Sequence, residues 1–393
     1  MSDILIESFD VNIGASGSTH TLTNDVGNIA NAFVRKITST DKATGLVGNT
    51  GNISPNNSHC GIALTDTDKL TFYKNNANSQ KQVGEVWRYT GAGGGDNEFI
   101  VRGSYAITVT GSSATATVTG LVDRNKAVPI FNGVNSDQTS TSNYEETTFA
   151  VHINSSGEVV VSRNNNTAGT QVVYVTVVEF TGSNWSVGHG VSSNHDASIE
   201  TVTLNTDSTG AGGSTFDVGD WSTAMIIEAT MEGDTSETGL ADVLALVQPS
   251  GTGVTFSVTE GDGNARNDGT GYIHVIQHND LNVNRATNNN FSEGNNTYAN
   301  INSFPSGTPT DKNLDQLSME WFVSTTGTGT AHARGRLTAR VTDATGTIQT
   351  WVHRSGNNVK IYYGVADLSG IVSSGSSFNN SWAFGSNTVL GVN

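Results

Sequence analysis

The chain is poor in cysteine, proline and long apolar runs, and each shortage excludes a class of protein. Its 393 residues include one cysteine, Cys60, so an intrachain disulfide framework is excluded. Because Cys60 begins an apolar stretch, residues 60–64, we expect a buried structural thiol. The 5 prolines exclude a collagen and a Pro-rich disordered chain. No stretch approaches the roughly 18 apolar residues of a membrane span, and the opening Met1-Ser2-Asp3-Ile4 lacks the basic and apolar segments of a signal peptide. We therefore expect a protein made in the cytoplasm, with no signal peptide and no membrane insertion.

Positive charge is also scarce. Lys and Arg number 19 against 36 Asp and Glu, which gives a formal net charge of −17. Binding to a duplex requires Lys and Arg to neutralise phosphates, so we expect no nucleic-acid partner. Charged residues are only 14% of the chain, and the polarity comes from neutral Thr, Ser and Asn.

An internal repeat is the strongest positive signal. Four β-rich segments align with one another, and they begin at Val83, Tyr174, Tyr272 and Tyr362. A period of roughly 90 residues is typical of one small all-β domain per copy. Each copy also contains a strand near its middle and a hairpin with a polar turn, such as residues 65–68 in the first copy. Apolar and polar residues alternate along these segments, the pattern of a sheet with one buried face.

The sequence therefore predicts an all-β fold, a tandem array of four small antiparallel β-sandwich domains of the Ig-like or jelly-roll-like kind. Gly-, Asn- and Ser-rich stretches set the predicted boundaries. The predicted domains are residues 1–92, 93–182, 183–281 and 282–368, followed by a C-terminal β extension over residues 369–393. Helical periodicity is almost absent, and only residues 240–247 and 314–317 could supply a helical turn.

Two histidines in the third copy have the spacing of metal ligands. His274 and His278 are four residues apart in a predicted strand and would share one face of it. The repeat favours packing instead, because the other copies fill the position of His278 with Tyr89, Phe180 and Leu368. We expect a structural role for both histidines.

Two loops offer further ligand types. His189 and His195 flank a Ser- and Gly-containing loop, where we expect them to be solvated rather than bound to a metal. Asp262, Asn264 and Asp268 have the composition of a calcium loop. They lack the Gly at position six and the Glu at position twelve of an EF-hand, so a calcium site of another kind stays an open alternative. We assign no metal site and no cofactor.

The chain contains none of the sequence motifs of a nucleophile elbow, a phosphate-binding loop or a metalloprotease helix. The adjacent Glu145 and Glu146 would face opposite ways on a strand, so they would not converge on a glycosidic bond. The sequence favours a protein that is not an enzyme.

Tryptophans are the candidate surface contacts. An exposed indole can stack on a sugar ring, and Trp185, Trp321, Trp351 and Trp382 are the candidates for such a ligand surface. The alternative is a core position, because these residues occur about once per copy, as in β-sandwich domains with one core tryptophan.

The chain resembles virion structural proteins of tailed bacteriophages of marine bacteria. The resemblance extends over the whole chain in its tandem Thr-, Ser-, Asn- and Gly-rich β copies. It includes the opening segment Ile4-Leu5-Ile6-Glu7-Ser8-Phe9 and the segment Thr19-His20-Thr21-Leu22-Thr23-Asn24. It implies a capsid decoration, head fibre or tail appendage, located in the virion.

The expected function is therefore a non-enzymatic structural component of a virion. The resemblance implies assembly with copies of itself as a symmetric homo-oligomer, with a trimer favoured, and contact with other virion proteins and a host surface glycan. The alternative is a carbohydrate-binding or adhesive module on a bacterial surface, which would require export.

Overall fold

The computed structural model describes an all-β chain. The described residues are 2–14, 16–41, 59–75, 80–139, 147–164, 169–192, 200–232, 246–257, 269–291, 297–301, 314–325, 337–341, 348–352 and 359–372. They form eight antiparallel three-stranded sheets joined by loops and short 3-10 turns, and none of them lies in an α-helix. Among these residues no helix is both long and apolar enough to cross a membrane.

The first copy shows the topology. Its six strands are β1 (Ile4–Ile13), β2 (Thr19–Thr21), β3 (Ala32–Asp41), β4 (Gly61–Asp66), β5 (Lys69–Tyr73) and β6 (Gln80–Tyr89). The first, sixth and third strands form one sheet in the order β1-β6-β3, and the second, fifth and fourth form another in the order β2-β5-β4. The sixth strand is therefore central in one sheet and the fifth in the other.

The same order of strands recurs three more times. Copy 2 contains β7 (Ile100–Val109), β8 (Ser113–Thr117), β9 (Ala127–Ser136), β10 (Ala150–Ile153), β11 (Glu158–Ser162) and β12 (Gln171–Glu179). Copy 3 contains β13 (Ser186–Ser192), β14 (Glu200–Val202), β15 (Ala224–Met231), β16 (Leu246–Ser250), β17 (Gly253–Ser257) and β18 (Gly271–Gln277). Copy 4 contains β19 (Asn282–Phe291), β20 (Thr297–Ile301), β21 (Leu317–Thr325), β22 (Leu337–Val341), β23 (Ile348–Val352) and β24 (Val359–Asp367). Strand pairing among the described residues stays within a copy.

A single 3-10 turn precedes the third strand of every copy. These turns are η1 (Ile29–Asn31), η2 (Arg124–Lys126), η4 (Trp221–Thr223) and η6 (Leu314–Gln316). The first three begin after Asn28, Asp123 and Asp220, whose side-chain oxygens accept a hydrogen bond from the backbone N–H two residues on. This is the local capping that Asn and Asp favour. The helical turn predicted for residues 314–317 is confirmed as η6 followed by the first residue of β21.

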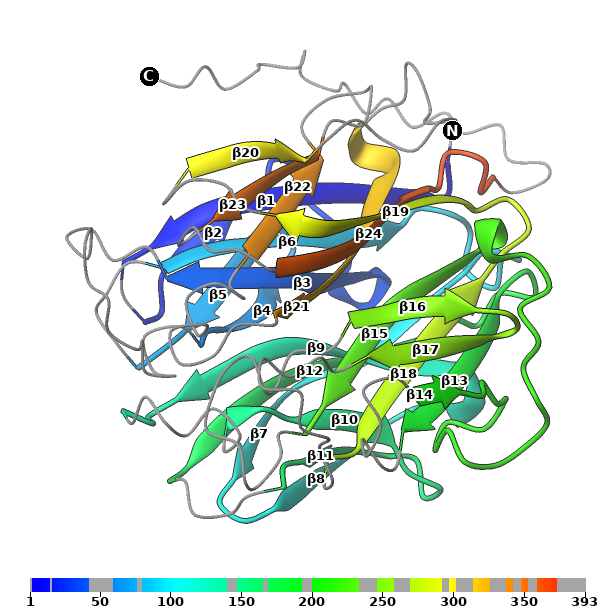
Figure 1. The fold of residues 1–393 in the computed structure, drawn as a ribbon, viewed down its shortest axis with the longest axis horizontal. Helices are drawn as coiled ribbons and strands as arrows, with labels where there is room; N and C mark the ends of the chain where they lie inside the picture. The colour runs from blue at the N-terminus through cyan, green and yellow to red at the C-terminus, as the bar shows by residue number, and fades with distance from the viewer. Residues whose placement is uncertain are drawn as a thin grey trace.

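The four copies contact one another in a closed cycle. Each third strand contacts the third strand of the next copy, in the order β3, β9, β15, β21 and back to β3. In Figure 1 copies 1 and 4 occupy one half of the view and copies 2 and 3 the other half. The two ends of the cycle are joined by a hydrogen bond of 2.7 Å from the Asp3 N–H to the Ile371 carbonyl. The copies therefore form a ring rather than an extended array.

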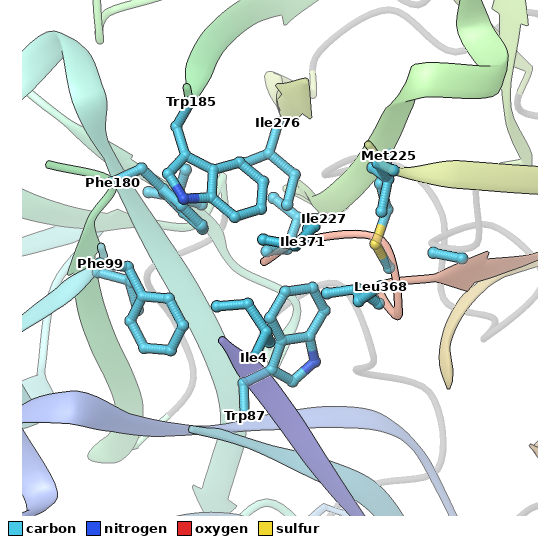
Figure 2. Packing of buried hydrophobic residues seen from close by; sticks show 14 of the residues in the cluster. Ile4, Trp87, Phe99, Phe180, Trp185, Met225, Ile227, Ile276, Leu368 and Ile371 are labelled. Atoms are coloured by element: carbon cyan, nitrogen blue, oxygen red, sulfur yellow. The ribbon is translucent and has the colours of Figure 1, made fainter. Parts of the chain in front are cut away.

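A shared core fills the centre of the ring. Figure 2 shows side chains from all four copies converging there, among them Trp87, Phe180, Trp185 and Leu368. The repeat explains this convergence. The four aligned segments begin at Val83, Tyr174, Tyr272 and Tyr362. The residues four positions further on all belong to this core, and they are Trp87, Val178, Ile276 and Ala366. Separate apolar clusters combine residues from both sheets of copy 1, of copy 2 and of copy 3.

Candidate functional site at the interfaces between the copies

A pair of buried histidines lies where copy 3 meets copy 2. His189 in β13 is opposite His274 in β18, and their Nδ1 atoms are 2.9 Å apart. The Nε2 atom of His189 lies 3.0 Å from the Asn125 carbonyl oxygen, and that of His274 lies 3.4 Å from the Val151 carbonyl oxygen. Burial lowers the pKa of His189 to about 4 and that of His274 well below its usual value. Both imidazoles are therefore neutral at pH 7.

The hydrogen bonds assign the protons of this pair. His189 donates from Nε2 to the Asn125 carbonyl, the shorter of the two backbone contacts, so its Nδ1 is the acceptor and His274 donates from Nδ1. His189 thus bridges from copy 3 to the backbone of copy 2, whereas His274 uses its single N–H within the pair and has no proton on Nε2 to donate to the Val151 carbonyl.

Three carboxylates each accept a hydrogen bond from the backbone of a neighbouring copy. Glu85, Glu228 and Glu320 accept hydrogen bonds from backbone N–H groups of the preceding copy's third strand. The donors are Met319 at 2.9 Å, Phe131 at 2.9 Å and Ile226 at 2.6 Å, respectively. A third strand is an edge strand of its sheet, so its outward N–H groups need such partners when they are buried.

Two arginines supply the complementary donors. Arg35 donates to the carbonyl oxygens of Ile227 at 2.8 Å and Met319 at 2.5 Å, in copies 3 and 4. Arg285 pairs with Glu320 at 2.7 Å and donates to the Trp221 and Ala224 carbonyls of copy 3. These two arginines and the three glutamates thus each meet the backbone of another copy.

Burial perturbs two of these carboxylates, Glu85 and Glu228. It raises the pKa of Glu85, an effect that Arg35 opposes, and it raises the pKa of Glu228 to about 7. A glutamic acid that titrates near neutrality is the kind of group that acid–base catalysis uses. Here both oxygens of Glu228 accept backbone N–H groups, from Phe131 and from its own neighbour Ala229. The arrangement serves packing between strands.

A polar hub closes one end of the central core. Asn97 donates from Nδ2 to the Asp3 carboxylate at 2.9 Å and accepts at Oδ1 from Asn184 at 2.7 Å. The same oxygen lies 2.9 Å from Nε2 of His278, and the backbone carbonyl of Asn97 accepts from the Trp185 indole N–H at 2.9 Å. The hub ties the starts of copies 1, 2 and 3 to the end of copy 3.

The histidines have partners other than those that the spacing suggested. His274 pairs with His189, whereas His278 lies in the hub with its ring 4.7 Å from that of Trp185. Both side chains are buried and bonded within the chain, which is consistent with the structural role expected for them. His189 is buried rather than solvated, which corrects that expectation, because its strand pairs with β18 inside the ring. His195, Glu145, Glu146 and the Asp262, Asn264 and Asp268 loop lie outside the described residues.

Sequence reasoning missed the pairing of His189 with His274. The two residues are distant along the chain, in the first and sixth strands of copy 3. The repeat contains a signal for this pairing. The first strand of each copy pairs with its sixth strand, and in copy 3 this pairing places His189 opposite His274. The described part of the chain contains no group of three or more His, Cys, Asp or Glu side chains suited to a metal ion.

The candidate tryptophans occupy different places. Trp185 is 2% exposed and lies in the central core, and Trp321 is 8% exposed with its ring 6.4 Å from that of Tyr363. Neither ring offers a face to a sugar in this chain. Trp351 lies in β23, where its Cα is paired with Tyr298 and Thr338, and Trp382 lies outside the described residues.

Cys60 is a buried free thiol, as expected for a structural cysteine. Burial raises its pKa to about 11, so it is protonated at pH 7 and a poor nucleophile. Its carbonyl oxygen accepts from the Lys36 ammonium at 2.7 Å, and burial lowers the pKa of Lys36 to about 8. This lysine, like Arg35 and Glu228, is directed at backbone.

One small hollow lies where copy 4 meets copy 1. Its volume is about 30 Å³, and its lining includes Glu7, Leu22, Arg88 and Asp315. This space is large enough for a water molecule but far smaller than the pockets of several hundred Å³ that bind small molecules. Comparison of the chain with protein-family models, with curated proteins and with solved structures finds no match.

Proposed function

We propose that the chain is a non-enzymatic structural component of a tailed-phage virion, a capsid decoration or a tail or fibre appendage. In this proposal each copy is a small β-sandwich domain, and the four domains form one rigid building block. The observation that carries it is the use of buried polar side chains. Glu85, Glu228, Glu320 and Arg35 all bind the backbone of another copy.

This use of charge favours assembly over catalysis. A catalytic acid, base or nucleophile has to reach a reacting atom in a cleft. Glu85 and Glu228, whose pKa values are raised by burial, instead satisfy edge strands within the ring. Their energetic role is to prevent unpaired backbone groups, each of which costs about 1–3 kcal/mol when buried.

The virion assignment is supported by the sequence resemblance and by the net charge of the chain. The resemblance to tailed-phage structural proteins covers the whole chain in its repeats and composition. A net charge of −17 with few Lys residues favours solubility and weak nonspecific adhesion. Many identical copies on a particle would convert weak contacts with a host surface glycan into strong avidity.

The test is immunogold electron microscopy of particles from the source culture, with an antibody raised against the purified chain. The proposal expects label on the particles, spread over the heads for a decoration or at one pole for a tail component. Unlabelled particles beside labelled bacterial cells would overturn it and favour the adhesive surface module.

A further inference from the structure

The ring protects most edges of the eight sheets and leaves one kind exposed. The 3-10 turn of each copy contacts the first strand of the next, and each fourth strand contacts the next third strand. The second strands β2, β8, β14 and β20 are the remaining outer edges, each hydrogen-bonded to a single fifth strand. An edge of this kind presents unpaired N–H and C=O groups on its outer side.

The four second strands differ in how well they resist pairing. β2 and β14 have three residues each, and they include His20 and Glu200, respectively. β8 has five residues, Ser113-Ala114-Thr115-Ala116-Thr117, with no charge, no proline and an unbroken register against β11. Short strands, charges, prolines and bulges are the devices that block edge pairing, and β8 has none of them.

The charge around β8 points to a copy of the same chain as its partner. No residue from Gly103 to Val122 is charged, in a chain whose net charge is −17, and the neighbouring strand β11 brings a single carboxylate beside β8, that of Glu158 opposite Thr117. Two such chains repel one another wherever acidic surfaces meet, so a self-contact requires an uncharged patch. The side chains of Ser113, Thr115 and Thr117 are exposed on this strand.

The sequence of β8 is also symmetric about its centre. Thr115 is flanked on both sides by alanine, Ala114 and Ala116, and then by the hydroxyl residues Ser113 and Thr117. Two antiparallel β8 strands centred on Thr115 therefore place Ala opposite Ala and hydroxyl opposite hydroxyl. A twofold interface needs this self-complementarity. The other five-residue second strand, Thr297-Tyr298-Ala299-Asn300-Ile301, lacks it.

We propose that β8 is the docking edge for a second copy of this chain, through antiparallel β8–β8 pairing about a twofold axis at Thr115. The pairing joins two three-stranded sheets into one six-stranded sheet across the dimer. The inference rests on the proposed structural function and specifies how the building block associates. It gives a dimer as the first contact, whereas the sequence favoured a trimer.

The test uses the self-opposed position of Thr115 in the full chain. Sedimentation velocity at high micromolar concentration should give a wild-type mass of twice the 41.1 kDa of one chain. Thr115→Asp places two carboxylates opposite one another and should weaken dimerisation about tenfold or more, and Thr115→Lys should do the same with two ammonium groups. An equimolar mixture of the two variants should restore the dimer, because opposite charges then meet.

The matched control is Thr21→Asp, the same change on an exposed residue of the second strand of copy 1. It should leave the dimer intact. A monomeric wild type, a dimer that survives Thr115→Asp, or a mixture that fails to associate while both variants are folded by circular dichroism would overturn β8 pairing. Such a result would not bear on the proposed virion function, because particle labelling tests that proposal separately.

Discussion

At the scale of single residues, burial decides what each titratable side chain does. His152 in β10 stacks on Tyr272, with ring centroids 4.1 Å apart and an interplanar angle of 12°. The stack crosses from copy 2 to copy 3, and Nδ1 of His152 is buried without a hydrogen-bond partner. Burial lowers the pKa of His152 from 6.5 to about 4. The folded protein therefore holds this imidazole neutral at a pH where the unfolded chain protonates it.

His152→Phe should flatten the loss of stability in acid. A depressed histidine pKa gives stability that is fully present above pH 6.5 and lost as the pH falls towards about 4. Phenylalanine keeps the stack with Tyr272 and does not titrate, so the free energy of unfolding should change by less than about 1 kcal/mol at pH 7. Urea unfolding at several pH values tests this. Parallel pH profiles for variant and wild type would contradict it.

Gly133 is a second residue whose neighbour belongs to another copy. Its φ is +97°, and a Cβ built on it would lie 2.1 Å from the Cys60 carbonyl oxygen of copy 1. Gly133→Ala combines this clash with backbone strain, and we expect a loss of about 3 kcal/mol or more in unfolding free energy. Gly120→Ala is the matched control, since its φ is +75° with open space around it, and should cost only about 1 kcal/mol. Equal losses in the two variants would show that the contact between copies adds nothing.

At the scale of elements, the exposed edges of the sheets explain why the copies join. A third strand pairs with only one neighbour in its sheet, and a carboxylate from the next copy satisfies an N–H on its outer side. The interface between copies thus completes the sheet. A separated copy would expose these strands to pairing with other chains.

Glu228 offers a test at this scale. Glu228→Leu leaves the Phe131 N–H of β9 buried without its acceptor, which should cost about 1–3 kcal/mol. Glu228→Gln keeps an acceptor oxygen and should change unfolding free energy by less than about 1 kcal/mol below pH 4.5, where the wild-type carboxyl is neutral as well. Chemical denaturation compares the two variants. Equal losses of unfolding free energy in the two variants would contradict the role of the Glu228 oxygen as acceptor for the Phe131 N–H.

The pH dependence of Glu228 has the opposite sign to that of His152. Its pKa is raised from 4.5 to about 7, so its contribution is fully present below pH 4.5 and is lost as the pH rises through about 7. The Gln variant does not titrate and should therefore gain stability relative to the wild type over that range. The same denaturation series shows whether it does.

At the scale of the whole molecule, the central core couples all four copies. It combines Trp87, Phe180, Trp185 and Leu368, so no copy buries its share alone. We expect one calorimetric unfolding transition for the full chain rather than four, with agreement between calorimetric and van't Hoff enthalpies. Residues 1–182 produced alone should expose half of this core and unfold at a lower temperature or associate. Several separate transitions in the full chain would contradict the ring.

The β architecture was predictable from local signals. Alternating residues, polar turns and the copy alignment correctly indicate antiparallel strands, the hairpins β4–β5 and β10–β11, and the equivalence of Trp87 with Val178. They also favoured a packing role for His278, through the aromatic residues at its equivalent positions. The position of Trp185 was left open, because an isolated tryptophan has the same sequence signal in a core and at a ligand surface.

The sequence by itself determined the strands, their repetition and the buried nature of Cys60, because periodicity and composition act over a few residues. Only the tertiary structure decided that the repeats close into a ring, that His189 meets His274, and that Glu228 binds the backbone of copy 2. The two side-chain contacts join positions 85 and 97 residues apart, and the ring closes between Asp3 and Ile371. Strand pairing and the bonding of edge strands set these contacts, and a local sequence pattern does not show which distant residues meet.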